Sequence, residues 1–409
     1  MLGLVRAGDG RGGGGRDLRA DVFRGLALWF IFIDHVPGNL LGGVTLQNVA
    51  LCDATEAFVL LAGYAAGLAY GAMLDRQGWL FAAAALLRRV GTLYIAHIFL
   101  FVVFTAQVGY SAAALDSAAY LDELHLDAFG EQPYRALLEA LLLRFQPAFL
   151  DILPLYIVLL LMLVPGLLLL HRPRLLVALS MAAYVAVRVT DVNLPTWTGG
   201  GWFLNPLAWQ ALFFIGCALG ASRRAGEKSP PIPRSRPVLL FCAALLAVGA
   251  VLVVAWQRPE PSPLLPDWVA AVLSGVDKTG LHPLRLLSVL ALAYLLGHWV
   301  RRDAAWLRSP FAAPLLLMGQ HGLPVFCAGI FLSFVGRLAL ERSEGWAMQA
   351  AVNLLGLAAL VAIAAVGAWY RRRSAGGGGG TTRAPVPAAP EAGEGPVLPA
   401  VAANRTMAG

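Results

Sequence analysis

The sequence predicts an all-α integral membrane protein of about ten transmembrane helices, with both ends of the chain in the cytoplasm. Hydrophobic residues make up 58% of the chain and charged residues only 13%, a balance that excludes an ordinary soluble globular protein. Several apolar runs approach or exceed the roughly 20 residues that cross a bilayer. Lys and Arg residues are also unevenly shared between alternate loops, which is typical of a polytopic membrane protein.

Three parts of the chain differ in composition. Residues 1–19 are predicted to form a flexible, basic cytoplasmic tail, residues 20–371 a transmembrane domain, and residues 372–409 a disordered tail rich in Gly, Ala and Pro. The hydropathy pattern places ten spans in the domain. Their predicted ranges are 21–42, 52–74, 88–108, 150–170, 174–190, 205–221, 237–256, 282–300, 311–335 and 349–370.

The distribution of basic residues predicts the orientation. With the N-terminus inside, the cytoplasmic segments hold 22 Lys and Arg residues and the outer segments hold 8. Arg24, inside the first span, completes the total of 31. Because positive charge is retained on the cytoplasmic side, this split favours an even number of spans with both termini inside. The longest outer segment, 109–149, contains YRALLEALLLRF, which we expect to form an amphipathic helix on the outer leaflet.

Other chemistries lack their signatures. The net charge of +7 is explained by membrane topology, since no basic patch is interleaved with aromatic residues as nucleic-acid binding would require. There is no phosphate-binding glycine loop, no dinucleotide fingerprint and no nucleophile elbow. The cysteines show no paired spacing, so neither a disulfide framework nor a metal site is expected; they are Cys52, Cys217, Cys242 and Cys327.

The first predicted span carries two ionisable residues on one face. Arg24 and His35 are eleven residues apart, which on a helix is about three turns and roughly 16 Å. Ionisable residues inside a span are functional-site candidates. His35 suits proton transfer near neutral pH, with Asp34 beside it. The alternatives are that His35 satisfies a hydrogen bond in the core, and that Arg24 reaches the interface or pairs with Asp21.

A helical hairpin then brings further acids to the His35 end. Pro37 and Gly38 end the first helix, and Asp53 and Glu56 begin the second, three residues apart on one face. Asp53 could serve only as a helix cap. Glu56 lies a turn deeper, where it must be protonated or paired.

Most of the remaining polar residues of the spans also gather on the outer side. For Asp151, Trp209 and Gln210, the alternatives are binding of lipid headgroups or stabilisation of packing. Only Asp21 and Arg24 lie at the cytoplasmic end of the first helix. This layout suits a protein that takes a charged donor from the cytoplasm and modifies a molecule on the outer side. The outer residues are Asn39, Asp151, Trp209, Gln210, Lys278 and Arg285.

Six stretches resemble the OpgC family of membrane proteins, which is associated with succinylation of periplasmic glucans. They are RADVFRGLALWFIFIDHVPGN, TLQNVALCDATEAFVLLAG, FLDILPLYIVLLLMLVP, WFLNPLAWQALFFIGCALG, DKTGLHPLRLLSVLALAY and GQHGLPVFCAGIFLSF. The spacing from Arg24 to His35 is also similar to that of the wider acyltransferase family 3. One departure is Ser288, where the family pattern has His.

This resemblance implies an O-acyltransferase of the bacterial inner membrane. It would move an acyl group, succinyl by the resemblance, from a cytoplasmic acyl-CoA donor to a sugar hydroxyl of a periplasmic glucan or surface polysaccharide. Without a nucleophile signature, direct transfer is the simpler mechanism. We expect the lipid bilayer, the glycan and the donor as partners, and no permanently bound cofactor, metal or nucleic acid.

The predicted site residues fall into three groups. His35 is the proposed general base, assisted by Asp34 and Glu56. Arg24, with Asp21, would hold a phosphate or carbonyl of the donor, which suits a permanently charged guanidinium. The acceptor would meet residues of the outer side, where Lys278 or Arg285 could also bind a succinyl carboxylate. This last group is Asn39, Asp53, Asp151, Trp209, Gln210, Lys278 and Arg285.

Two other classes of function are compatible with buried acids and histidines. A proton-coupled transporter of small acids or glycans predicts an internal repeat between halves of the chain, and none is found. A non-catalytic scaffold for glucan synthesis predicts that loss of His35 is tolerated. A substitution at His35 therefore distinguishes a scaffold from an enzyme.

The topology can be measured directly. Reporter fusions at residues 125 and 268 are expected to behave as periplasmic, whereas fusions after Arg88, Arg223 and Arg301 are expected to behave as cytoplasmic. A cytoplasmic signal from residue 125 or 268 would overturn the orientation.

Overall fold

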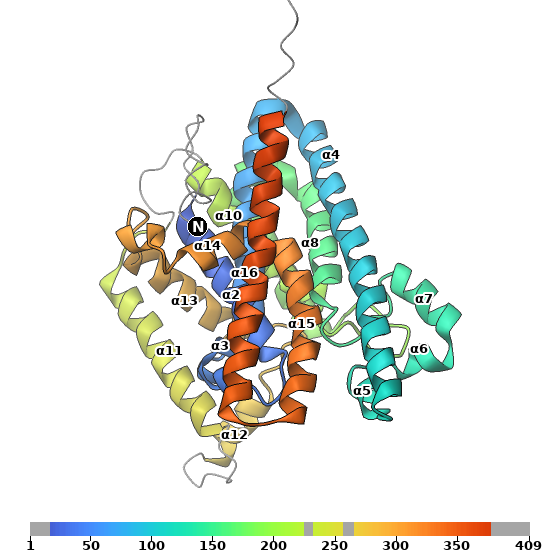
Figure 1. Ribbon diagram of the computed structural model, residues 1–409. Coiled ribbons are helices and arrows are strands. Elements are labelled where there is room, and N and C mark those ends of the chain that lie inside the picture. Colours follow the sequence, from blue (N-terminus) through green and yellow to red (C-terminus); the bar gives the residue numbers. More distant parts are fainter. Residues whose placement is uncertain (1–16, 225–231, 257–265, 378–409) are drawn as a thin grey trace, which may run out of the picture. The chain divides into compact units, whose positions relative to one another are not determined.

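The computed structural model describes residues 17–224, 232–256 and 266–377. The predicted tails lie mostly outside these ranges. Residues up to Trp369 form one compact unit. The described residues form helices and no β-sheet, which confirms the all-α fold class. The helices, shown in Figure 1, are α2 (Leu18–Asp34), η2 (Leu40–Val44), α3 (Leu46–Val49), α4 (Ala54–Ala114), α5 (Ala119–Glu123), α6 (Asp127–Glu131), α7 (Pro133–Leu141), α8 (Ile152–Gly166), η3 (Leu167–His171), α9 (Pro173–Thr190), α10 (Pro206–Arg224), α11 (Arg236–Trp256), α12 (Asp267–Ser274), α13 (Pro283–Trp299), η4 (Ala305–Arg308), α14 (Ala313–Gln320), α15 (Gly322–Arg342) and α16 (Trp346–Gly377).

Six helical segments in the described ranges are long and apolar enough to cross a membrane, which supports an integral membrane protein. A helix lies at each of the ten predicted ranges, but several are shorter than a full span, so the count of ten stays a prediction. The six segments are Ala54–Ala114, Ile152–His171, Pro173–Thr190, Arg236–Trp256, Gly322–Arg342 and Trp346–Ser374.

Helix α4 contains two limbs joined by one residue. Gly78 has φ 80° and ψ 175°, a conformation that only glycine adopts without strain. The chain reverses there, as Figure 1 shows near the top of the picture. The predicted loop 75–87 is therefore helical except at Gly78, and the second and third predicted spans form one tight helical hairpin.

The contact between α4 and α10 depends on two interlocking glycine pairs. Gly63 and Gly67 lie one turn apart on α4, and Gly216 and Gly220 lie one turn apart on α10. A Cβ at Gly63 would lie 2.1 Å from the carbonyl oxygen of Phe213, and a Cβ at Gly216 would lie 2.3 Å from that of Leu60. Small residues spaced in this way allow helix backbones to approach closely in a membrane. This contact fixes the first limb of α4, whose N-terminus carries Asp53 and Glu56.

Helix α2 begins at the cap residue Asp17 and ends at Asp34. His35 is the C-cap residue, and its backbone N–H donates to the carbonyl oxygen of Ile31. Gly38 has φ 75°, which turns the chain away from the helix. The predicted span 21–42 is therefore shorter as a helix, and Asp34 and His35 lie at its end.

Helix α16 holds the loop that follows His35. The side chains of Asn39 and Asn353 exchange two hydrogen bonds of 3.0 and 2.9 Å. Gln349 donates to the carbonyl oxygen of Gly38 and accepts from the backbone N–H of Leu40. These amide contacts join the last helix to the end of α2.

The close approach of α4 and α10 predicts a strong asymmetry between glycines. Gly63→Ala is expected to lower the free energy of unfolding by about 1–3 kcal/mol, because the added methyl group meets backbone. The control is Gly91→Ala on the second limb of α4, where nothing lies within 4 Å of the new Cβ. Equal losses in steric-trapping measurements of the two variants would contradict the proposed role of this contact.

Candidate active site

The N-terminus of α4 is closed by a reciprocal cap. The backbone N–H of Thr55 donates to Asp53 Oδ1 at 2.6 Å, and the backbone N–H of Asp53 donates to Glu56 Oε2 at 2.9 Å. Both carboxylates are buried, and Glu56 has no exposed surface. The helix dipole stabilises negative charge at this end. The predicted alternative for Asp53, a helix cap, is thus present, and Asp53 has further partners.

Two cations that precede and begin α13 complete a charged cluster with these acids. Lys278 Nζ lies 2.7 Å from Asp53 Oδ2, and Arg285 Nη2 lies 3.1 Å from the same oxygen. Arg285 Nε donates to Glu56 Oε1 at 2.6 Å. We call these four residues the charged cluster. The opposite charges match in number, which offsets much of the cost of removing each ion from water.

Lys278 remains charged in this environment. Burial lowers the pKa of Lys278, but the attraction of Asp53 and Glu56 outweighs burial and raises that pKa above its ordinary value. The ammonium donates to Thr55 Oγ1 at 3.3 Å as well as contacting Asp53. It also lies 5.9 Å from the centre of the Phe203 ring, within range of a cation–π contact. An ammonium group has three N–H donors, and the described residues provide hydrogen-bond acceptors for two of them.

His35 is held in one tautomer. Its Nδ1 lies 2.5 Å from the carbonyl oxygen of Ile31. A carbonyl oxygen can only accept, so the proton lies on Nδ1, and the neutral ring has its lone pair on Nε2. The ring also packs edge-on against Phe149, with 4.4 Å between centroids. Among the described residues, Nε2 of His35 has no hydrogen-bond partner, so it is the open proton acceptor at this end of α2.

The other predicted acids lie beside this histidine and the charged cluster. Asp34 Oδ1 accepts a hydrogen bond of 2.6 Å from Thr45 Oγ1. Asp34, His35 and Asp151 each interact electrostatically with both Asp53 and Lys278. The structure therefore gathers at one end the acids and the base that the sequence predicted there.

Three predicted acceptor contacts are already satisfied within the protein. Trp209 has no exposed surface, and its Nε1 donates to the carbonyl oxygens of Lys278 and Thr279. Gln210 accepts from Ser180 Oγ at 2.6 Å and donates to the Ser180 carbonyl oxygen. Asn39 bonds to Asn353 on α16, as described above. Their roles toward an acceptor stay predictions, and the contacts match the alternative in which they stabilise packing.

Arg24 and Asp21 lie at the opposite end of α2. Arg24 Nη1 lies 3.4 Å from Asp21 Oδ1, so the predicted alternative of a pair with Asp21 is present. The same guanidinium donates to the carbonyl oxygens of Leu61 on α4 and Gly319 on α14. Arg24 thus joins three helices, and a role in donor binding stays a prediction.

The family described as OpgC protein matches residues 16–372 of the chain. The chain belongs to the OpgC family. This membership indicates a role in modification of periplasmic glucans. No significant match was found among curated proteins or among solved structures.

Ser288, where the resemblance to the OpgC family implied a His, lies beside the charged cluster. Ser288 is one turn after Arg285 on α13, and its Oγ donates to the sulfur of Cys52 at 3.4 Å. A histidine in place of Ser288 would bring a second imidazole to the buried side of the cluster. The sequence did not predict the contact with Cys52, although Ser288 had been singled out as a departure from the family resemblance.

The charged cluster predicts strong coupling between α4 and α13. Glu56→Gln and Arg285→Gln should each lower the free energy of unfolding by about 3 kcal/mol, because each leaves a buried partner unpaired. The double variant should lose less than the sum, with a coupling energy of about 1–3 kcal/mol.

The control for this comparison of single and double variants is the ion pair of Arg301 and Asp303. These residues lie 2.9 Å apart, and their side chains are 79% and 70% exposed. Arg301→Gln and Asp303→Asn should show no measurable coupling. If the losses of unfolding free energy in Glu56→Gln and Arg285→Gln are additive in the same assay, the charged cluster is excluded as a stabilising unit.

Proposed function

We propose that the chain is a membrane O-acyltransferase that moves an acyl group from a cytoplasmic acyl-CoA-type donor to a sugar hydroxyl of a periplasmic glucan or surface polysaccharide. The observation that carries the proposal is His35, whose Nδ1 is committed to Ile31 and whose Nε2 is open beside the charged cluster. A base held in one tautomer by a backbone carbonyl is the arrangement that general-base catalysis requires. OpgC family membership supports the glycan as acceptor.

In the proposed reaction, the acceptor hydroxyl gives its proton to His35 Nε2 as its oxygen attacks the thioester carbonyl. The tetrahedral intermediate then collapses, the carbon–sulfur bond breaks, and the thiolate of the donor leaves and takes up the proton. The net products are the ester of the sugar and the free thiol. Direct attack needs no covalent enzyme intermediate.

The charged cluster has a supporting role in this reaction. The third N–H donor of Lys278 is placed to bind the developing oxyanion or, for a succinyl group, its free carboxylate. Asp34, held by Thr45, adds a carboxylate that can orient the acceptor or an imidazolium at His35. Succinyl as the acyl group rests on the family likeness.

The proposed topology places this chemistry at the periplasmic face of the bacterial inner membrane. The Lys and Arg distribution puts the His35 end outside and the Arg24 end inside. Arg24 and Asp21 would then contact the donor from the cytoplasmic side, about 16 Å from His35 along α2. The acyl group would cross the intervening distance within the helical bundle.

Substitution of His35 tests the proposal. Loss of a general base typically reduces the rate about 10²- to 10⁴-fold, so His35→Ala should nearly abolish acylation. Asp34→Asn should reduce the rate less, because it changes only the charge beside His35. The effect of Glu56→Gln should lie between the two, because an amide can partly imitate a protonated carboxyl group. The measurement is mass analysis of glycans from strains that carry each variant at matched protein abundance.

The control histidine is His171, which pairs with Asp75 at an exposed position. His171→Ala should leave acylation unchanged. Acyl transfer by His35→Ala within a few fold of the wild-type protein would exclude His35 as the base and favour a scaffold or a transporter. Loss of acylation together with loss of protein from the membrane would point to folding, which detergent-extracted size-exclusion profiles detect.

A further inference from the structure

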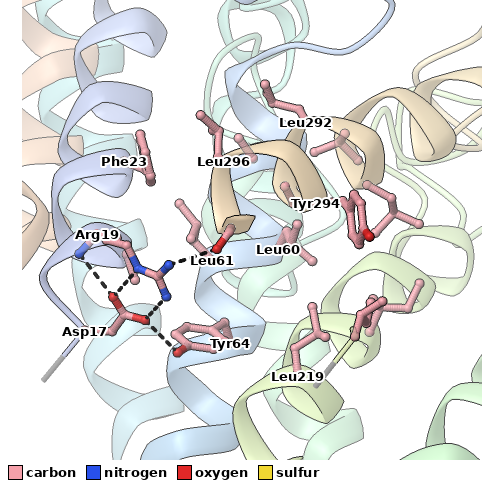
Figure 2. Close-up of a pocket in the computed structure, with 18 of the residues that line it drawn as sticks. Asp17, Arg19, Phe23, Leu60, Leu61, Tyr64, Leu219, Leu292, Tyr294 and Leu296 are labelled. Atoms are coloured by element: carbon pink, nitrogen blue, oxygen red, sulfur yellow. Dashed lines mark hydrogen bonds and ion pairs between the residues drawn. The ribbon is translucent and has the colours of Figure 1, made fainter. Parts of the chain in front are cut away.

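A cavity of about 340 Å³ lies among α2, α4, α10 and α13, and its α4 wall begins at Ala57, the residue after Glu56 of the charged cluster. Figure 2 shows apolar side chains from all four helices turned toward it. On α4 it extends from Ala57 to Tyr64, seven residues or about 10 Å along the helix. The walls are almost entirely hydrocarbon, and include Phe23, Leu60, Leu61, Leu219, Leu292 and Leu296.

Asp17 and Arg19, at the start of α2, line this cavity and form an ion pair. Arg19 contacts Asp17 through Nε at 3.0 Å and Nη2 at 2.9 Å, and donates to the carbonyl oxygens of Gly297 and Val300 at the end of α13. The hydroxyl of Tyr64 donates to Asp17 Oδ2 at 3.1 Å. Burial raises the pKa of Asp17, but the hydrogen bond and charge of Arg19 outweigh burial and lower that pKa below its ordinary value. Asp17 is therefore ionised and already paired.

Arg223 on α10 has a donor without a partner among the described residues. Its side chain lines the cavity, and its Nε is buried with no hydrogen-bond acceptor within the described ranges. Arg302 adds a further guanidinium at the same end, 3.5 Å from Asp17 Oδ2. With Asp17 neutralised by Arg19, positive charge is in excess there. A buried guanidinium donor without an acceptor favours an anionic ligand.

We propose that this cavity binds one anionic phospholipid, with an alkyl chain along the apolar wall and the phosphate group at Arg223. The proposed topology places the Asp17 end at the cytoplasmic leaflet, where anionic headgroups are found, and basic pockets between transmembrane helices bind such headgroups. The apolar wall matches an alkyl chain. The arm of an acyl-CoA fits less well, because its amides would be buried without hydrogen-bond partners.

The test uses the purified full-length chain in detergent, titrated with dioleoyl phosphatidylglycerol or dioleoyl phosphatidylcholine and followed by native mass spectrometry. The wild-type protein should bind one phosphatidylglycerol about fivefold more tightly than phosphatidylcholine, the preference expected for one Arg near the phosphate. Arg223→Gln should abolish this preference and Arg223→Lys should retain it. The matched control is Arg76→Gln, since Arg76 is exposed and does not line the cavity.

A second pair of variants tests where the chain lies. Ala293→Trp fills the cavity and should weaken binding of both lipids at least fivefold. Ala106→Trp, at an exposed position on the second limb of α4, should not change binding. Because Arg223→Lys keeps the positive charge, a folding defect in Arg223→Gln leaves the charge comparison intact.

Three results would overturn the proposal. The first is equal affinity of the wild-type protein for the two lipids. The second is identical binding by Arg223→Gln and Arg76→Gln. The third is displacement of phosphatidylglycerol by an equimolar acyl-CoA, which would assign the cavity to the donor. Acylation is not read in any of these experiments, so the result does not depend on the proposed function.

Discussion

The pairing of two buried carboxylates with two cations constrains the arrangement of this protein more than any other contact. Asp53 and Glu56 must be buried because they begin α4, which packs closely on α10 through glycines. Ions in such a position need partners of opposite charge and good geometry. Arg285 contacts both acids, and Lys278 contacts Asp53 from the segment before α13. The start of α13 is thereby fixed against α4, and the same contacts place Lys278 beside His35 and Asp34.

The sequence was sufficient to predict which residues share this end of the bundle. Hydropathy gave the helices, and the turn after His35 required Asp53 and Glu56 to return to the same end. It could not pair Glu56 with Arg285, which is 229 residues away, because apolar periodicity identifies helices but not their neighbours. The sequence predicted that the chain reverses between the second and third spans but did not place the turn at Gly78, since a single glycine with positive φ interrupts no apolar pattern. The two glycine pairs of α4 and α10, whose spacing is typical of close helix contacts in membranes, were not recognised in the sequence.

Residues such as Trp209, Gln210 and Asn39 show why polar side chains near a site are ambiguous in a membrane protein. In apolar surroundings each donor and acceptor requires a partner. Trp209 meets the backbone before α13, Gln210 meets Ser180, and Asn39 meets Asn353. These contacts position the segment that bears Lys278 and the loop after His35. Sequence alone cannot distinguish a polar group that supports a site from one that touches a ligand, because both are required to lie in the same place.

The donors and acceptors that lack a hydrogen-bond partner are then the informative ones. At one end of α2, Nε2 of His35 has no partner among the described residues while the surrounding carboxylates do, so proton transfer is directed to a single nitrogen. At the other end, Arg19 pairs with Asp17 while Nε of Arg223 has no acceptor among the described residues, so this guanidinium is open to an anion. At both positions a polar atom without a partner lies beside groups that are paired. Such an atom costs free energy in the unliganded protein, and a bound substrate or lipid that completes its hydrogen bond recovers that free energy.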